Sequence, residues 1–156
     1  MKKFTFNLQS VLDHRLLLEE REQEKLLRIQ QEITLAEAGL QQLRNEIHEL
    51  RLRMAQPEPG EVHVEKVLQV TRYVGKLEDD GAALARKITQ LEQQKRSQSE
   101  VWLEARRNRE VLENLKDKNL TQYQREASAM EQKLLDELAV VKFAPQDEQN
   151  LPAGKH

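Results

Sequence analysis

Pro57-Glu58-Pro59-Gly60 interrupts a chain that otherwise favours continuous helix. A proline inside a helix lacks an N–H donor, and its ring clashes with the turn before it. Glycine supplies the backbone freedom that a chain reversal needs. The segments that run back to Asn7 and forward to Ala144 contain no other proline and are rich in good helix formers. The sequence therefore predicts one long helix, a tight turn and a longer helix folded back.

The predicted fold class is all-α, a long antiparallel two-helix coiled-coil hairpin whose second helix is longer and overhangs the first. We expect a single hairpin domain over residues 1–144. Within it we place a helix at about 8–55, a turn at 56–61 and a helix at about 62–143.

Both ends of the predicted hairpin carry local signals. Asn7 is a suitable N-cap, because its side chain can accept a hydrogen bond from the first helical turn. Pro145 disfavours helical geometry at the residue before it. Residues 145–156 are polar and also hold Pro152 and Gly154, so we expect a flexible C-terminal tail.

Apolar residues recur along the first helix at alternating steps of three and four, the heptad pattern of a left-handed coiled coil. The positions are Leu26, Ile29, Ile33, Ala36, Leu40, Leu43, Ile47, Leu50 and Met54. The same register extended backwards gives Glu22, Glu19, Arg15, Leu12 and Leu8. Charge interrupts the seam there, so we expect either matching charges on the partner helix or loose packing.

The second helix carries two apolar stripes in different registers. The first comprises Val64, Val67, Val70, Val74, Leu77, Gly81, Leu84, Ile88 and Leu91, and continues through Lys95, Gln98, Trp102 and Ala105. The second comprises Leu120, Tyr123, Ala127, Met130, Leu134, Leu138 and Val141. Its shift relative to Leu112 and Leu115 predicts a stutter, where a supercoil locally unwinds. Gly75 and Gly81 lower the helix propensity of the segment that they bound, so a local hinge at Gly75–Gly81 is one alternative.

The two predicted helices differ in length. At 1.5 Å per residue, a helix over 8–55 spans roughly 70 Å and one over 62–143 roughly 120 Å. If they pair from the turn, residue 8 lies opposite a residue near 110, and the stripe from Leu120 to Val141 projects uncovered. An exposed apolar stripe on a protruding helix predicts a protein partner, with self-association as the alternative.

The composition argues against a compact globular core. The chain is 33% charged and 4% aromatic with a formal net charge of -2, so it has no strong field that attracts nucleic acid or anionic lipid. It holds no cysteine, which excludes disulfides and thiolate metal sites. Polar residues interrupt the N-terminus, and no run of about 18 apolar residues occurs, so we expect a cytoplasmic protein without a secretory signal or membrane span.

No catalytic constellation is present in the sequence. The four histidines are scattered and lack the Glu-x-x-His pairing of a di-iron bundle: His14, His48, His63 and His156. Asp79-Asp80-Gly81 lacks the alternating oxygen ligands of a calcium loop. There is no phosphate-binding loop of a nucleotide hydrolase. We therefore expect no enzyme activity, no metal, no cofactor and no small-molecule substrate.

A basic cluster lies in the second helix, at Arg106, Arg107, Arg109, Lys116 and Lys118. Acidic residues interleave with it, which favours a solvated face with i,i+4 pairs. An acidic protein surface is the second interpretation, and nucleic acid is disfavoured by the interleaved carboxylates. Trp102 fits either seam packing or a partner anchor, so Trp102, Arg106 and Arg109 are candidate anchor residues.

Two stretches resemble the family of the flagellar export protein FliJ. Phe4-Thr5-Phe6-Asn7-Leu8-Gln9-Ser10-Val11-Leu12 is similar to the opening of many members. Met130-Glu131-Gln132-Lys133-Leu134-Leu135-Asp136-Glu137-Leu138-Ala139 is similar to the family's most recognisable signature. Trp102 and the arginine-rich segment after it also fit, so the resemblance covers essentially the full length.

The resemblance implies an antiparallel two-helix coiled coil similar to the central stalk of rotary ATPases. It implies a non-enzymatic component of the flagellar type III protein export apparatus. Such a protein inserts in the ring of the hexameric export ATPase, promotes ring assembly and activity, links the ring to the membrane export gate and escorts export chaperones. By this likeness the chain is peripheral to the inner face of the cell membrane, at the flagellar base.

The same likeness assigns expected contact residues. The ends of both helices would enter the ATPase ring, through Leu8, Val11, Leu12, Met130, Lys133, Leu134, Asp136, Glu137 and Leu138. The middle of the hairpin would face the export gate or a chaperone, through Leu43, Leu50, Tyr73, Leu77 and Leu84.

Three alternatives stay open at this point. A stalk protein of a virulence type III secretion system shares the same layout. A structural coiled-coil scaffold would instead self-associate through its C-terminal stripe. An enzyme built in a helical bundle would need clustered ligands that the sequence lacks.

Overall fold

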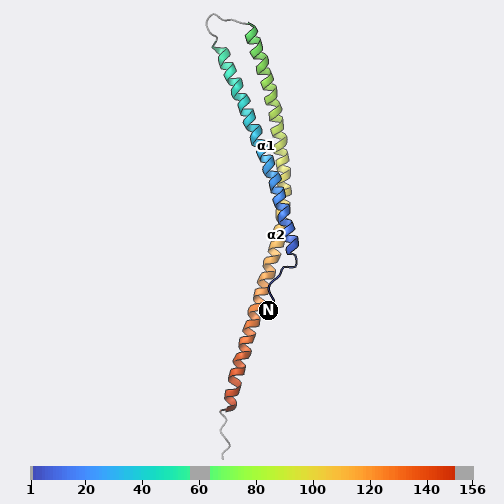
Figure 1. Cartoon of the computed structure of the whole chain (residues 1–156), viewed down its shortest axis with the longest axis vertical. Helices are drawn as coiled ribbons and strands as arrows, with labels where there is room; N and C mark the ends of the chain where they lie inside the picture. Colours follow the sequence, from blue (N-terminus) through green and yellow to red (C-terminus); the bar gives the residue numbers. More distant parts are fainter. Residues whose placement is uncertain (1, 57–63, 150–156) are drawn as a thin grey trace, which may run out of the picture. The chain divides into compact units, whose positions relative to one another are not determined.

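The computed structural model describes residues 2–56 and 64–149, with side chains as far as Lys142. It holds two helices, α1 (Gln9–Ala55) and α2 (Val64–Gln149), drawn in Figure 1 from blue to red along the chain. No strand occurs among the described residues. The predicted all-α class with a longer second helix is confirmed.

The helix bounds agree with the predicted bounds except at the C-terminal end. The predicted turn lies outside the described residues apart from Gln56, and so does the last part of the predicted tail, residues 150–156. α2 continues through Pro145 to Gln149, beyond the predicted end near residue 143. A proline removes one backbone N–H, which weakens a helix. It also disfavours helical geometry at the residue before it, but a helix can continue past a proline despite both effects.

The chain divides into two compact units: Arg15–Arg107, and Met1–His14 with Asn108–His156. In the first unit α1 and α2 run antiparallel. Residues late in α1 pair with residues early in α2, and residues earlier in α1 pair with residues later in α2. Arg51 pairs with Glu78 near the end of α1. Lys95 Nζ donates to Gln30 Oε1 at 2.6 Å, deeper in the unit.

The predicted heptad positions form the buried seam of this unit. Buried among them are Ile33, Ala36, Ile47, Val74, Leu77 and Leu91. The positions between these are half-buried at the expected steps of three and four. Val64, Val67 and Met54 are exposed instead, and each lies near a helix end. Local periodicity therefore located the seam, apart from its terminal positions.

Polar partners from α2 fill the charged interruption of the seam. Gln98 Nε2 donates to the carboxylate of Glu22 at 2.5 Å and to the Glu22 backbone carbonyl at 3.1 Å. This hydrogen bond, with a second from Lys25, lowers the pKa of the Glu22 carboxyl. The partner that α2 supplies to Glu22 is therefore a neutral amide, not the matching charge that one of the two expectations required.

The second unit has its own small core, made by the start of α1, the segment before it and α2. Phe6, Leu12 and Leu112 are buried together, and Phe4 packs against them. The first turn of α1 closes through hydrogen bonds from the Gln9 N–H to the Phe6 carbonyl (3.1 Å) and from the Leu12 N–H to the Leu8 carbonyl (2.9 Å). The start of α1 therefore lies level with α2 near Leu112, close to the predicted position.

The predicted stutter is visible in the burial pattern of α2. The buried or half-buried positions pass from Leu112 to Lys116 to Leu120, which are two successive steps of four. A coiled-coil seam alternates three and four, so the extra step shifts the register as a stutter does. Lys116, rather than Leu115, occupies the intermediate position.

Candidate functional site: an uncovered apolar stripe on α2

The most distinctive surface of the second unit is an apolar stripe near the end of α2. Its members, which we term the bare stripe, are Met130, Leu134, Leu138 and Val141. Their exposed fractions are 57%, 60%, 59% and 65%. Steps of four, four and three keep them on one face of the helix. Nothing else in the described part of the chain covers this face, so it is open to a partner.

The same face of α2 is partly covered just before the bare stripe in sequence. Leu120, Tyr123 and Ala127, which we term the covered stripe, are half-buried. The Phe4 ring lies against the Tyr123 ring, with centroids 5.6 Å apart and planes tilted by 52°. The Tyr123 hydroxyl donates to the backbone carbonyl of Lys2. The N-terminal lead-in, residues 2–8, therefore runs beside α2 here, as Figure 1 shows.

This contact corrects the predicted extent of the overhang. The stripe was expected to be uncovered from Leu120 onwards, but it is uncovered only from Met130 onwards. The alternation of Phe4 and Phe6 with polar residues signals an extended segment with one apolar side. It does not reveal that this side packs on Tyr123, more than a hundred residues away in sequence, because the contact is non-local.

The predicted ring-contact residues divide into exposed and buried members. Leu8 and Val11 are exposed on α1 or just before it, whereas Leu12 is buried in the core of the second unit. On α2 the charged members of the set are all exposed: Lys133, Asp136 and Glu137. Gln132 Nε2 donates to Asp136 Oδ1 at 3.1 Å along the helix. The bare stripe is thus flanked by charged and polar side chains.

The predicted gate-contact residues lie mostly inside the seam of the first unit. Leu77 is buried, and Leu43, Leu50 and Leu84 are half-buried. Tyr73 is the exposed member, and its hydroxyl donates to Glu46 Oε1 at 2.7 Å. This hydrogen bond, followed by the nearby negative charges, raises the pKa of the Tyr73 phenol. As folded, this region presents Tyr73 and its acidic neighbour rather than an apolar surface.

Trp102 and Arg106 lie together on α2 in the first unit. The Arg106 guanidinium carbon is 5.6 Å from the centroid of the Trp102 ring, within cation–π range. Within residues 2–56 and 64–149, the buried Nε1 of Trp102 has no hydrogen-bond partner. Because this N–H is buried, it is not accessible to a hydrogen-bond acceptor on another protein. In the second unit, Arg109 Nη1 donates to Glu113 Oε2 at 2.6 Å.

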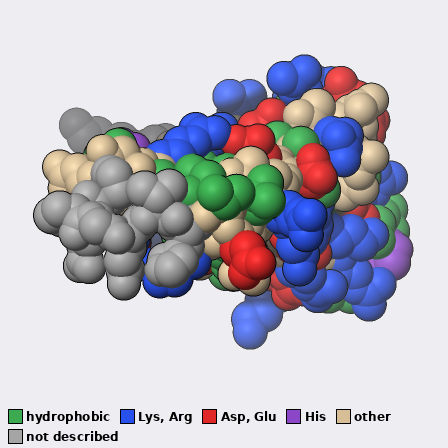
Figure 2. Space-filling view, turned by 90° about the horizontal axis from the view of Figure 1, so that it is seen from above, with side chains coloured by type: hydrophobic (Ala, Val, Ile, Leu, Met, Phe, Trp, Pro, Cys, Tyr) green, Lys and Arg blue, Asp and Glu red, His purple; other side chains and the backbone are tan. Residues whose placement is uncertain are grey.

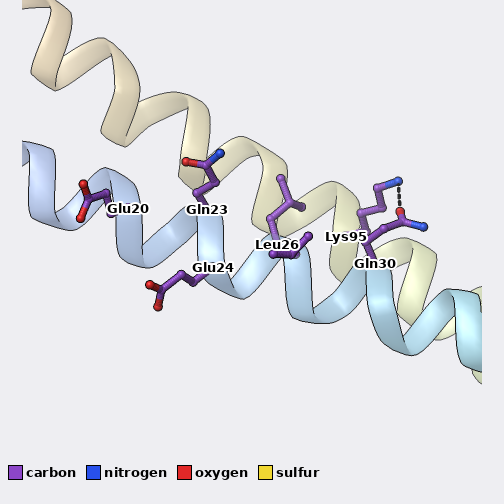
Figure 3. A pocket seen from close by; sticks show the side chains of 7 residues that line it. Glu20, Gln23, Glu24, Leu26, Gln30 and Lys95 are labelled. Atoms are coloured by element: carbon purple, nitrogen blue, oxygen red, sulfur yellow. Dashed lines mark hydrogen bonds between the residues drawn. The ribbon is translucent and has the colours of Figure 1, made fainter.

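A shallow groove runs along α1 in the first unit (Figure 3). Gln23 and Leu26 point toward α2, whereas Glu24 points away from it. Lys95 reaches across from α2 to Gln30 at the end of the groove. The lining residues are Glu20, Gln23, Glu24, Leu26, Leu27, Gln30 and Lys95. The groove is therefore lined by carboxylates, amides, leucines and one lysine, whose ammonium is engaged by Gln30.

Charged side chains of both signs share the molecular surface. Figure 2 shows basic and acidic side chains next to one another on the visible face, with apolar ones between them. Exposed pairs one turn apart include Glu24 with Arg28 and Glu104 with Arg107. Among the described residues, neither helix contains a segment apolar enough to span a membrane.

Comparison with known proteins adds one match. Searches of curated proteins and of solved structures give no match. A family model described as "Flagellar FliJ protein" matches residues 4–148, which include most of the lead-in, all of α1, α2 up to its last residue, and the bare stripe. Because this match covers nearly the whole chain, the protein belongs to the flagellar FliJ family.

Proposed function

We propose that this chain is a non-enzymatic stalk of the flagellar type III export apparatus that inserts in the ring of the export ATPase. Family membership supports a role in flagellar export in general. The observation that carries the finer proposal is the bare stripe, an apolar helix face with no cover in the described chain. The covering surface would be the inner wall of the ATPase ring.

Covering the bare stripe would contribute several kcal/mol to binding. Fully burying a Leu, Met or Val side chain contributes about 1.5–3 kcal/mol relative to leaving it exposed. More than half of each of the four side chains is still exposed. A protein that covers all four therefore gains several kcal/mol before the costs of association, which are also several kcal/mol.

A stalk of this kind would act through asymmetry. The bare stripe lies on one face of one helix, while the other faces mix charged and polar residues with the apolar Leu135 and Val140. A six-fold ring around such a helix cannot contact it equally with every subunit. The subunit that covers the stripe would differ in energy from the others, which would bias ring assembly and the order of nucleotide hydrolysis.

The test is ATP hydrolysis and ring formation by the cognate export ATPase, with and without this protein. The variant Leu134→Asp, Leu138→Asp places two charges on the bare stripe. We expect the wild type to stimulate both activities and the variant to lose at least about tenfold in affinity, or about 1.4 kcal/mol.

The matched control is Leu135→Asp, Val140→Asp. These two side chains are as exposed as the stripe, but they fall off its spacing and lie to either side of it on the helix surface. The control adds the same charge to the same helix end and should keep wild-type stimulation. Equal loss in both variants, or no stimulation by the wild type, would contradict the proposal.

The proposal extends to a link with the export gate and to the escort of export chaperones, both at the inner face of the membrane. Family membership and the exposed Tyr73 support it. The four leucines of this region would need the seam to open before they could bind. Tyr73→Ala should therefore weaken gate or chaperone binding, while Glu37→Ala, an exposed control, should not.

A self-associating scaffold is the second candidate, because the bare stripe could equally be covered by a second copy of this chain. Sedimentation of the isolated protein distinguishes the two candidates. A stalk should be monomeric or only weakly associating, whereas a scaffold should form dimers that Leu134→Asp, Leu138→Asp dissolves.

A further inference from the structure

We infer that residues 2–5 form a releasable strap that hides part of the partner-binding face of α2. The inference rests on the proposed function, since the partner is the export ATPase proposed above. It concerns a different property, which is the length of the stripe available to that partner.

The covered and bare stripes are one continuous face. Leu120, Tyr123 and Ala127 precede Met130 at steps of three, four and three, so all of them lie in line with the bare stripe. The change from half-buried to exposed between Ala127 and Met130 does not follow a change in residue type. The contacts of the lead-in with this face fall at Tyr123, in the half-buried part of the stripe.

The lead-in is held unevenly along its length. Phe6 is buried with Leu12 and Leu112, so the inner end is anchored in a core. Phe4 is half-buried, and Lys2, Lys3 and Thr5 are exposed. The outer end is held by the ring contact of Phe4 with Tyr123, by the packing of the half-buried Phe4 against the edge of this core, and by the hydrogen bond from Tyr123 to the Lys2 carbonyl.

This gradient makes the outer end releasable without unfolding the unit. Residues 2–6 make no helical or strand ladder, so lifting residues 2–5 breaks no regular backbone hydrogen bonds. An aromatic pair of this kind contributes about 0.5–1.5 kcal/mol beyond its buried area. A partner that covers Leu120, Tyr123 and Ala127 replaces that contact, and the stripe then lengthens from Met130–Val141 to Leu120–Val141.

A closed strap reduces the apparent affinity of the partner by the fraction of molecules in which the strap is open. Phe4→Ser weakens the closed state and should tighten binding of the purified export ATPase by about threefold to tenfold, in line with the strength of an aromatic pair. Lys3→Ser is the matched control, because Lys3 is exposed and neighbours the strap contact without making it.

A covalent lock gives the opposite arm of the test. The chain has no cysteine, so Phe4→Cys with Tyr123→Cys provides a unique pair for a short, cleavable bis-maleimide. The cross-linked protein should bind the ATPase more weakly than the same protein after cleavage. Each single-cysteine variant treated with the reagent controls for the modification itself.

The outcomes separate this inference from the proposed function. Tighter binding by Phe4→Ser and weaker binding by the locked form support the strap. Equal affinities of wild type, Phe4→Ser and locked protein overturn the strap and leave the stalk in place. Weaker binding by Phe4→Ser also overturns it, because Phe4 would then be part of the contact. No binding by the wild type overturns the proposed function, and the strap with it.

Discussion

At the scale of single residues, Gln98 and Glu22 show how a coiled-coil seam accommodates a carboxylate. The Gln98 amide donates to Glu22 and Lys25 lies 3.2 Å from it, so the charged form is favoured and the pKa of Glu22 falls below its ordinary 4.5. A lowered folded-state pKa contributes stability above the ordinary value, and this contribution is lost as the pH falls through the folded pKa.

Gln98→Ala should therefore raise the pKa of Glu22 toward its ordinary value and reduce the acid dependence of unfolding below about pH 4.5. Carboxyl chemical shifts of Glu22, followed by NMR across the titration, measure this directly. Gln93→Ala, on an exposed position of the same helix, should leave the Glu22 pKa unchanged. An unaltered Glu22 pKa in Gln98→Ala would mean that the Gln98 hydrogen bond does not set it.

Trp102 allows a second prediction at this scale. Trp102→Phe loses indole area but removes a buried N–H that has no acceptor in the described chain. Leaving such a group unsatisfied costs about 1–3 kcal/mol, so the two effects oppose each other. The free energy of unfolding in urea should stay within about 1 kcal/mol of wild type. A loss well above that would indicate that the N–H does have a partner.

At the scale of the helices, the seam should dominate stability. Ile33 is 4% exposed and Leu35, two residues on, is 74% exposed. Ile33→Ala should cost about 2–4 kcal/mol, because it removes buried methyl groups and leaves a cavity. Leu35→Ala should change the free energy of unfolding by less than about 0.5 kcal/mol. Equal effects in urea denaturation would contradict the assigned seam.

Gly75 offers a stabilising substitution in α2. A Cβ added at Gly75 would meet no heavy atom within 4 Å, so alanine fits there without a clash. Gly75→Ala should raise the free energy of unfolding by about 0.5–1 kcal/mol, because glycine loses more backbone freedom in a helix. Thermal unfolding followed by circular dichroism measures the gain. A destabilised variant would argue that Gly75 adopts a conformation closed to alanine.

Sequence periodicity predicted the seam because a heptad is a local property of the chain. Each seam position was assigned from spacing alone, but the neutral partner of Glu22 was not expected, because the predicted match was a charge. The contact of Phe4 with Tyr123 could not be predicted, since nothing local to either residue specifies the other. The continuation of α2 through Pro145 was missed because a proline weakens a helix without always ending it.

At the scale of the whole molecule, the candidate site was predicted in part. The bare stripe was located from its spacing, and its exposure depended on the difference in length between the two helices. The uncovered part of the stripe was predicted to begin at Leu120, which is too early. The prediction did not include the packing of the lead-in against α2 at Tyr123. The region assigned to the export gate was chosen by likeness, and four of its five residues proved to lie in the seam.

The most direct test of the account places a photo-reactive amino acid at Leu134 and illuminates the protein with the assembled export ATPase ring. The same substitution at Leu35, exposed in the other unit, is the control. The account predicts a cross-link from position 134 to the ATPase, with one copy of this chain per six subunits by mass, and none from position 35. A cross-link from position 134 to a second copy of this chain, or none at all, would contradict it.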